Sequence, residues 1–169
     1  PEGRSITVLA KEKYGIRAEW HADPLLSIDV SDILRLKEGS RIETNEDRYL
    51  LAYILDPTSD KIEGIKDLAE KLGLSIRVIV DGFNHNRKQN INRLGALATC
   101  VQNDVGVSEF VSLFANSSYV VTDSFHGTVM SVKMEKQFAV VTGAKMHRGF
   151  TRLESLFSLT GLLGRHTYD

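Results

Sequence analysis

The segment VVTDSFHGTV, residues 120–129, places an acid, hydroxyls, an aromatic ring, a histidine and a glycine side by side. His126 can donate a hydrogen bond as an imidazolium or move a proton near neutral pH. Ser124 and Thr128 can donate hydroxyl hydrogen bonds, and Gly127 lets a backbone approach closely. These groups suit an anionic ligand, and phosphate is the natural candidate.

A structural interpretation of the same residues stays open beside the functional one. Asp123 is placed to orient His126 or the following backbone, but an unpaired carboxylate would repel an anion. Asp123 or Ser124 would equally serve as a helix cap, with Phe125 in the core and His126 bonded to a nearby carbonyl.

A second group of donors lies in GAKMHRGFTR, residues 143–152, which contains no acid. Its candidates for binding an anion are Lys145, His147, Arg148 and Arg152. The alternative is a solvated basic loop, and Arg152, in the first turn of the predicted last helix, is also placed to face solvent.

The elements that must position these residues alternate between strands and helices. Apolar runs predict strands at 49–55, 75–80, 119–122 and 137–141, and periodic segments predict helices at 60–73, 108–116, 127–136 and from 151 to Gly161. This alternation predicts an α/β fold, a Rossmann-like parallel sheet with helices on both faces.

His126 then lies between the carboxyl end of the strand at 119–122 and the amino end of a helix, where open α/β sheets bind ligands. Amides of residues 127–129 would be free to bind an anion there. The basic segment follows the next strand, so we expect it at the same edge of the sheet.

The amino-terminal part is less regular. We expect a helix at 5–14, a short strand at 16–20, a break at Asp23-Pro24 and a charged linker over 31–48. Residues 81–100 predict a loop with a short helix. The chain begins Pro1-Glu2-Gly3, so we expect a piece of a longer protein.

Composition excludes several classes of protein. The 169 residues are 42% hydrophobic, and 21 Lys+Arg stand against 22 Asp+Glu, which argues against a nucleic-acid or membrane-surface role. The single cysteine, Cys100, favours a reducing compartment, and no apolar run is long enough for a membrane span. We expect a cytoplasmic protein with no cofactor. We also expect no metal, because His21, His85 and His166 lack metal-ligand spacing.

Three segments resemble the polysaccharide pyruvyl transferase family. FVSLFANSSYVVTDSFHGTVMSVKMEKQFAVV, with its T-D-S-F-H-G-T core, looks like the family's most specific segment. YGIRAEWHADPLL is similar to a stretch that ends in Asp-Pro before the domain crossover, and TRLESLFSLTGLLGR is similar to the closing helix. The resemblance covers nearly the whole chain and is weakest over residues 81–104.

The resemblance implies a GT-B-like protein with its active site between two Rossmann-like halves. Residues 1–30 would be a stub of a largely missing amino-terminal domain, 31–48 the crossover and 49–169 the carboxy-terminal domain. The implied activity belongs to surface polysaccharide (exopolysaccharide) biosynthesis, the transfer of pyruvyl from phosphoenolpyruvate to a saccharide acceptor as a ketal. His126 would be catalytic, and Asp123, Ser124, Phe125, Gly127, Thr128 and the four basic residues would bind substrate.

One position departs from the family pattern. Members commonly have Arg-x-His, with the arginine on the phosphate, whereas this chain has Ser124 two residues before His126. The hypotheses left open are therefore a pyruvyl transferase, a glycosyltransferase-like enzyme with a nucleotide-sugar donor, and a noncatalytic sugar- or phosphate-binding domain. We expect acceptor contacts to lie largely in the missing domain, and this chain alone to be inactive.

Overall fold

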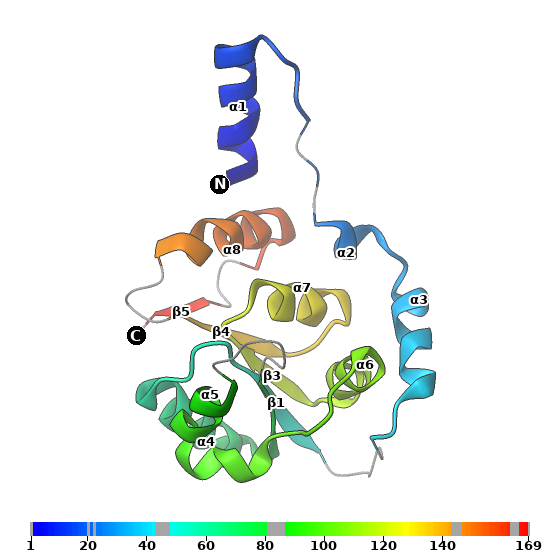
Figure 1. The fold of residues 1–169 in the computed structure, drawn as a ribbon, viewed down its shortest axis with the longest axis vertical. Coiled ribbons are helices and arrows are strands. Elements are labelled where there is room, and N and C mark those ends of the chain that lie inside the picture. The colour runs from blue at the N-terminus through cyan, green and yellow to red at the C-terminus, as the bar shows by residue number, and fades with distance from the viewer. Residues whose placement is uncertain are drawn as a thin grey trace.

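The computed structural model describes residues 2–19, 21, 23–42, 48–80, 87–142, 147–162 and 166–168. Its centre is a five-stranded sheet of order β2-β1-β3-β4-β5, and every pairing in it is parallel (Figure 1). The strands are β1 (Tyr49–Tyr53), β2 (Ser75–Ile79), β3 (Tyr119–Thr122), β4 (Phe138–Thr142) and β5 (His166–Tyr168). The predicted parallel sheet is confirmed, and β5 is a strand that the sequence did not predict.

The central strands β1 and β3 are buried on both faces because their side chains alternate between two apolar clusters. Tyr49 and Leu51 of β1 join one cluster, whereas Leu50 and Ala52 join the other. In β3, Val120 and Val121 divide in the same way. This burial explains why β1 and β3 are mostly apolar runs in the sequence.

Helices cover both faces of the sheet and supply the other half of each cluster. One face packs against α6, α7 and α8, and the other against α4, α5 and the 3-10 helix η2. The bounds of these helices are α4 (Ser59–Leu72), α5 (Arg87–Arg93), η2 (Gly95–Cys100), α6 (Val107–Asn116), α7 (Phe125–Lys133) and α8 (His147–Thr160). The expected arrangement of helices on both faces is confirmed.

Two helices that carry candidate site residues begin earlier than the sequence predicts. Helix α7 starts at Phe125 and not at Gly127, because Ser124 caps it. Helix α8 starts at His147 and not at Thr151, so the described part of the basic segment is helical and does not form a loop. Both changes move candidate site residues into the first turns of helices.

The amino-terminal part contains helix α1 (Glu2–Tyr14), which stands apart from the sheet in Figure 1. Residues 16–19 are not in a strand, so the predicted strand at 16–20 is wrong over its described part. Its alternation is too short to form a strand without a neighbour to pair with. The chain continues through α2 (Pro24–Ser27), α3 (Val30–Arg35) and the 3-10 helix η1 (Leu36–Gly39).

The segment predicted as a linker is therefore partly helical. Ile33 of α3 is buried in the same apolar cluster as Leu113 of α6, so this stretch packs onto the sheet domain. The proposed division into stub, crossover and carboxy-terminal domain stays a prediction.

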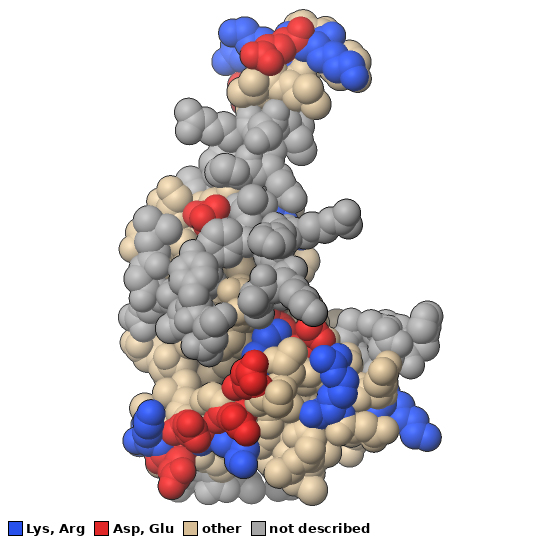
Figure 2. Space-filling view, turned by 90° about the vertical axis from the view of Figure 1, so that its left-hand side faces the viewer, with Lys and Arg blue, Asp and Glu red and all other residues tan. Residues whose placement is uncertain are grey.

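Figure 2 shows basic and acidic side chains interspersed over one face of the molecule, in keeping with the balanced composition.

Candidate active site

His126 lies in the first turn of α7, immediately beyond the carboxyl end of β3. Its side chain is 65% exposed, and its Nε2 atom lies 4.0 Å from Oδ2 of Asp23. Asp23 reaches this position because its other carboxylate oxygen, Oδ1, accepts a hydrogen bond from Leu25 N–H (3.0 Å) and caps α2. The Asp-Pro break thus brings an acid to the imidazole from far away in the sequence.

Arg152 approaches the same turn of α7 from α8. Its guanidinium lies over the Phe125 ring, 4.3 Å from the centroid, and the ring of Phe125 is edge-on to that of His126 at 5.5 Å. A cation over an aromatic face is attracted by the ring quadrupole. One arginine of the basic segment therefore lies two ring contacts from the candidate catalytic histidine.

The other members of the basic segment are located less fully. His147 and Arg148 belong to the first turn of α8, but their side chains lie outside the described residues, as does the whole of Lys145. Their role as anion donors stays a prediction.

The amides at the start of α7 do not all remain free to bind an anion, although this was expected from the sequence for residues 127–129. Gly127 N–H donates to the Ser124 hydroxyl (3.3 Å), and Thr128 N–H donates to the Ser124 carbonyl (3.0 Å). The Thr128 hydroxyl donates to that same carbonyl (2.9 Å). Helix geometry leaves the amides of Phe125 and His126 as the ones without an intrahelical partner. The amides at 127 and 128, expected to be free, are engaged within the helix.

Gly127 has a packing reason to lack a side chain. A Cβ at this position would meet the Thr122 hydroxyl below contact distance, and it would lie 2.9 Å from Cδ1 of Tyr53. The Thr122 hydroxyl cannot retreat freely, because it donates to Tyr53 O (2.7 Å) and accepts from Ser124 N–H (3.1 Å). Glycine therefore allows α7 to sit closely on the ends of β1 and β3.

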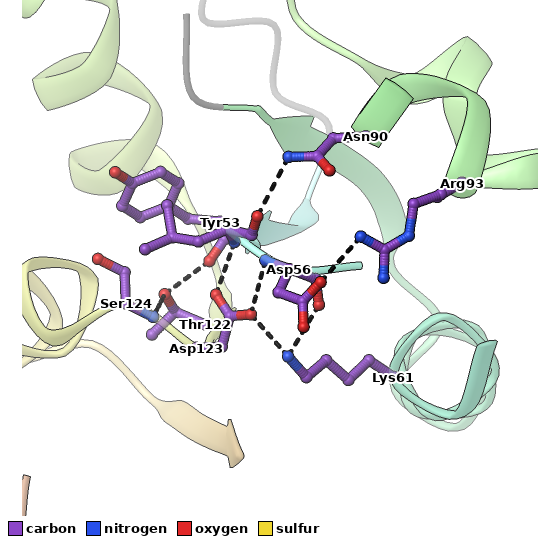
Figure 3. A network of polar contacts seen from close by, with 9 residues as sticks. Tyr53, Asp56, Lys61, Asn90, Arg93, Thr122, Asp123 and Ser124 are labelled. Atoms are coloured by element: carbon purple, nitrogen blue, oxygen red, sulfur yellow. Dashed lines mark hydrogen bonds and ion pairs between the residues drawn. The ribbon is translucent and has the colours of Figure 1, made fainter. Parts of the chain in front are cut away.

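Asp123 is buried, and its carboxylate is fully engaged by the protein (Figure 3). Oδ1 accepts from Leu55 N–H at 2.6 Å, and Oδ2 accepts from Asp56 N–H at 3.1 Å. The Lys61 ammonium donates to Oδ2 at 2.7 Å and to the Asp56 carbonyl at 2.8 Å. Asp123 thus ties the ends of β1 and β3 together, and it orients backbone and not His126.

Lys61 is a residue that sequence analysis missed. Its side chain is only 6% exposed and pairs with an Asp123 side chain that is 1% exposed. The available signal was its position in the first turn of α4, where a cation opposes the helix dipole and needs an acidic partner.

Neighbouring polar contacts support the loop after β1. Asn90 of α5 donates to Leu55 O at 3.2 Å, and Arg93 pairs with Asp56 at 2.9 Å. Both residues lie on α5, so the segment predicted as a mostly irregular loop supplies contacts to the turn that Asp123 holds (Figure 3).

In the described ranges no three His, Cys, Asp or Glu side chains come together as a metal site would require. The helices within those ranges include none with the length and apolar character needed to cross a membrane.

Comparison with known proteins decides the family. A sequence model of the family described as polysaccharide pyruvyl transferase matches residues 5–144, most of the chain. The chain belongs to the polysaccharide pyruvyl transferase family. No curated protein and no solved structure gave a significant match.

The polysaccharide pyruvyl transferase match includes most of the site just described. It spans Asp23, Lys61, Asp123 and His126, and it ends before α8. Arg152 lies outside the matched residues, so its contact with Phe125 is known from the structure alone.

Proposed function

We propose that this chain carries the donor side of a pyruvyl transferase that moves pyruvyl from phosphoenolpyruvate to a saccharide acceptor as a cyclic ketal. The supporting observation is the convergence of an exposed His126, the Asp23 carboxylate and the Arg152 guanidinium at one turn of α7. That turn lies at the carboxyl edge of a parallel sheet, where such folds bind ligands.

His126 is the proposed acid and base of the reaction. As an imidazolium it protonates the methylene carbon of the donor, so that a sugar hydroxyl can add to the neighbouring carbon. A second hydroxyl of the sugar then forms the other C–O bond as the C–O bond to phosphate breaks. One hydroxyl proton restores the imidazolium, and the other leaves with the phosphate. Positioned proton transfer of this kind contributes about 10²–10⁴ in rate.

Asp23 is suited to assist this cycle by orienting the imidazole, because its carboxylate lies beside one ring nitrogen of His126. The carboxylate lies 4.0 Å from Nε2 of His126, and its hydrogen bond with Leu25 N–H keeps it in this position. The other ring nitrogen, Nδ1, is then the one proposed to face the donor.

The donor carries a phosphate and a carboxylate, so it needs cationic partners. In this proposal Arg152 meets one of them, together with the amides of Phe125 and His126, and Lys145, His147 and Arg148 meet the other. Arg152 would also compensate for the arginine that Ser124 replaces. It would supply from α8 the guanidinium that other family members have two residues before the histidine.

An amide NMR titration of the chain tests the proposal. Phosphoenolpyruvate should shift the resonances of residues 125–128 and 147–152, and His126→Gln should weaken that binding at least tenfold. His21→Gln is the matched control, because the side chain of His21 is exposed and contacts only Glu19 among the ion pairs of the described residues. Phosphoenolpyruvate, inorganic phosphate and a nucleoside diphosphate sugar are titrated separately.

The competing hypotheses predict different outcomes. Shifts with the nucleotide sugar and none with phosphoenolpyruvate would replace pyruvyl transfer by glycosyl transfer. Equal binding of inorganic phosphate and phosphoenolpyruvate, unaffected by His126→Gln, would favour a noncatalytic phosphate-binding domain.

A further inference from the structure

The strand order β2-β1-β3-β4-β5 has a single switch point, between β1 and β3, where the connections leave in opposite directions. Sheets of this order usually bind their ligand in the crevice at the carboxyl ends of those two strands. In this chain that position holds a group of converging donors. They are the amides of Leu55 and Asp56, which follow β1, and the ammonium of Lys61 in the first turn of α4.

Two backbone N–H groups and a lysine are a donor set that proteins commonly present to phosphate and carboxylate ligands. Here all three donors end on the Asp123 carboxylate, at 2.6, 3.1 and 2.7 Å. The Asp123 and Lys61 side chains are 1% and 6% exposed, so water does not compete for these bonds.

We propose that the β1/β3 switch point is an anion-binding site that the chain fills with its own Asp123 carboxylate. The position where a nucleotide phosphate would sit in a sheet of this order is therefore closed. The donor is confined to the first turn of α7, where His126 lies and Arg152 contacts Phe125.

The location assigned to the donor rests on the proposed function. The anion-binding site filled by Asp123 does not. A filled switch point is consistent with a chain that keeps the strand order of a nucleotide-binding sheet and carries its exposed His126 in the first turn of α7, with Arg152 approaching from α8. It also assigns Asp123 a positioning role: through the turn 123–124 it fixes where α7 begins, and hence where His126 lies.

Replacing the carboxylate tests the site directly. Asp123→Ala removes a group of the size of formate and leaves Lys61 and two amides without their anion. Breaking a buried pair in this way should lower the melting temperature by roughly 6–20 °C. Added formate, compared with chloride at equal ionic strength, should raise it again with the logarithm of concentration, as expected for a bound ligand.

Three controls separate a specific site from a general effect of the salt. Leu113→Ala makes an apolar cavity in the core and should show no more response to formate than the unmodified chain does. Asp123→Asn keeps the space filled and should not respond to formate. The double variant Asp123→Ala with Lys61→Met should lose most of the recovery.

If Asp123→Ala does not fold in chloride, its refolding yield in formate is the measurement. A formate-dependent melting temperature or refolding yield, absent in the controls, supports the proposal. Equal behaviour in formate and chloride overturns it, whatever donor the chain binds.

The closure of the switch point is tested in the unmodified chain. Inorganic phosphate and formate should shift the amides of Leu55 and Asp56 in Asp123→Ala and leave them unmoved when Asp123 is present. If phosphoenolpyruvate shifts the amide resonances of Leu55 and Asp56 in the unmodified chain, the switch point is open to ligands and this part of the proposal is wrong. Absence of donor binding anywhere would contradict the proposed function and leave the formate result intact.

Discussion

The Nε2 atom of His126 and the Oδ2 atom of Asp23 lie 4.0 Å apart, although the two residues belong to different parts of the fold. Helix α2 is kept on α7 by a second contact, because the Lys133 ammonium donates to Leu26 O at 3.0 Å. Asp23 therefore serves both as the cap of α2 and as the acid that faces the candidate catalytic histidine.

Replacing Asp23 separates these two roles. Asp23→Asn should leave stability within about 0.5 kcal/mol of the original, because asparagine caps a helix as well as aspartate does, whereas Asp23→Ala should cost about 1 kcal/mol. In thermal denaturation the alanine variant should melt about 2–4 °C lower. Equal losses in the two variants would mean that the charge beside His126, and not the cap, provides the stability.

Arg152 should matter for ligand binding more than for stability. Its contact with Phe125 is exposed and worth about 0.5–1 kcal/mol, whereas a charged hydrogen bond to the donor contributes about 1.5–3 kcal/mol. Arg152→Ala should therefore weaken phosphoenolpyruvate binding about tenfold or more in calorimetric titration. Arg35→Ala is the control, since Arg35 is exposed on α3 and pairs with Asp32. Equal affinities in the two variants would remove Arg152 from the site.

Alanine at two helical glycines should have opposite effects. Gly127→Ala should destabilise the chain by about 1–3 kcal/mol, because the new Cβ would be forced against Tyr53 and Thr122. Gly64→Ala has open space around it within α4 and should stabilise by up to about 1 kcal/mol. Urea denaturation measures both. A neutral Gly127→Ala would show that α7 can shift, and with it His126.

Alkaline pH should weaken the chain through Tyr49. Burial raises the pKa of Tyr49 to about 12, against a partial opposing effect of Arg77, and its hydroxyl donates to Leu113 O at 2.7 Å. A raised pKa means that this stabilisation is complete below pH 10 and is lost as pH rises from 10 toward 12. The loss should approach about 2–3 kcal/mol across that window. Urea midpoints should fall more steeply in the unmodified chain than in Tyr49→Phe, and parallel slopes would contradict the assignment.

The sheet was predictable because parallel strands buried on both faces give apolar runs that local patterns reveal, as in residues 49–53 and 119–122. Helix ends were less predictable. Ser124 was recognised as a possible cap, but the start of α7 at Phe125 instead of Gly127 also involves a tertiary contact, the hydrogen bond from Ser124 N–H to the Thr122 hydroxyl. Strand β5 has only three residues, too few to give a pattern.

The candidate site was predictable in its composition and not in its pairings. His126 and Arg152 were named from their residue types and neighbouring positions. Asp23 was noted only as part of an Asp-Pro break, because nothing in one sequence reports that residues 23 and 126 meet. Lys61 was passed over because a lysine among apolar helix positions looks solvated until its buried partner is known.

The pairing of β1 with β3 has a consequence for how the chain folds. Tyr53 and Thr122, joined by a hydrogen bond, are 69 residues apart in sequence, and β2 and α4 to α6 lie between them. Contacts of such long range require loop closure before they return any stabilisation, and they make folding slow. The geometry of the turn that carries His126 depends on this long-range pairing, so a short peptide containing TDSFHGT should not retain it.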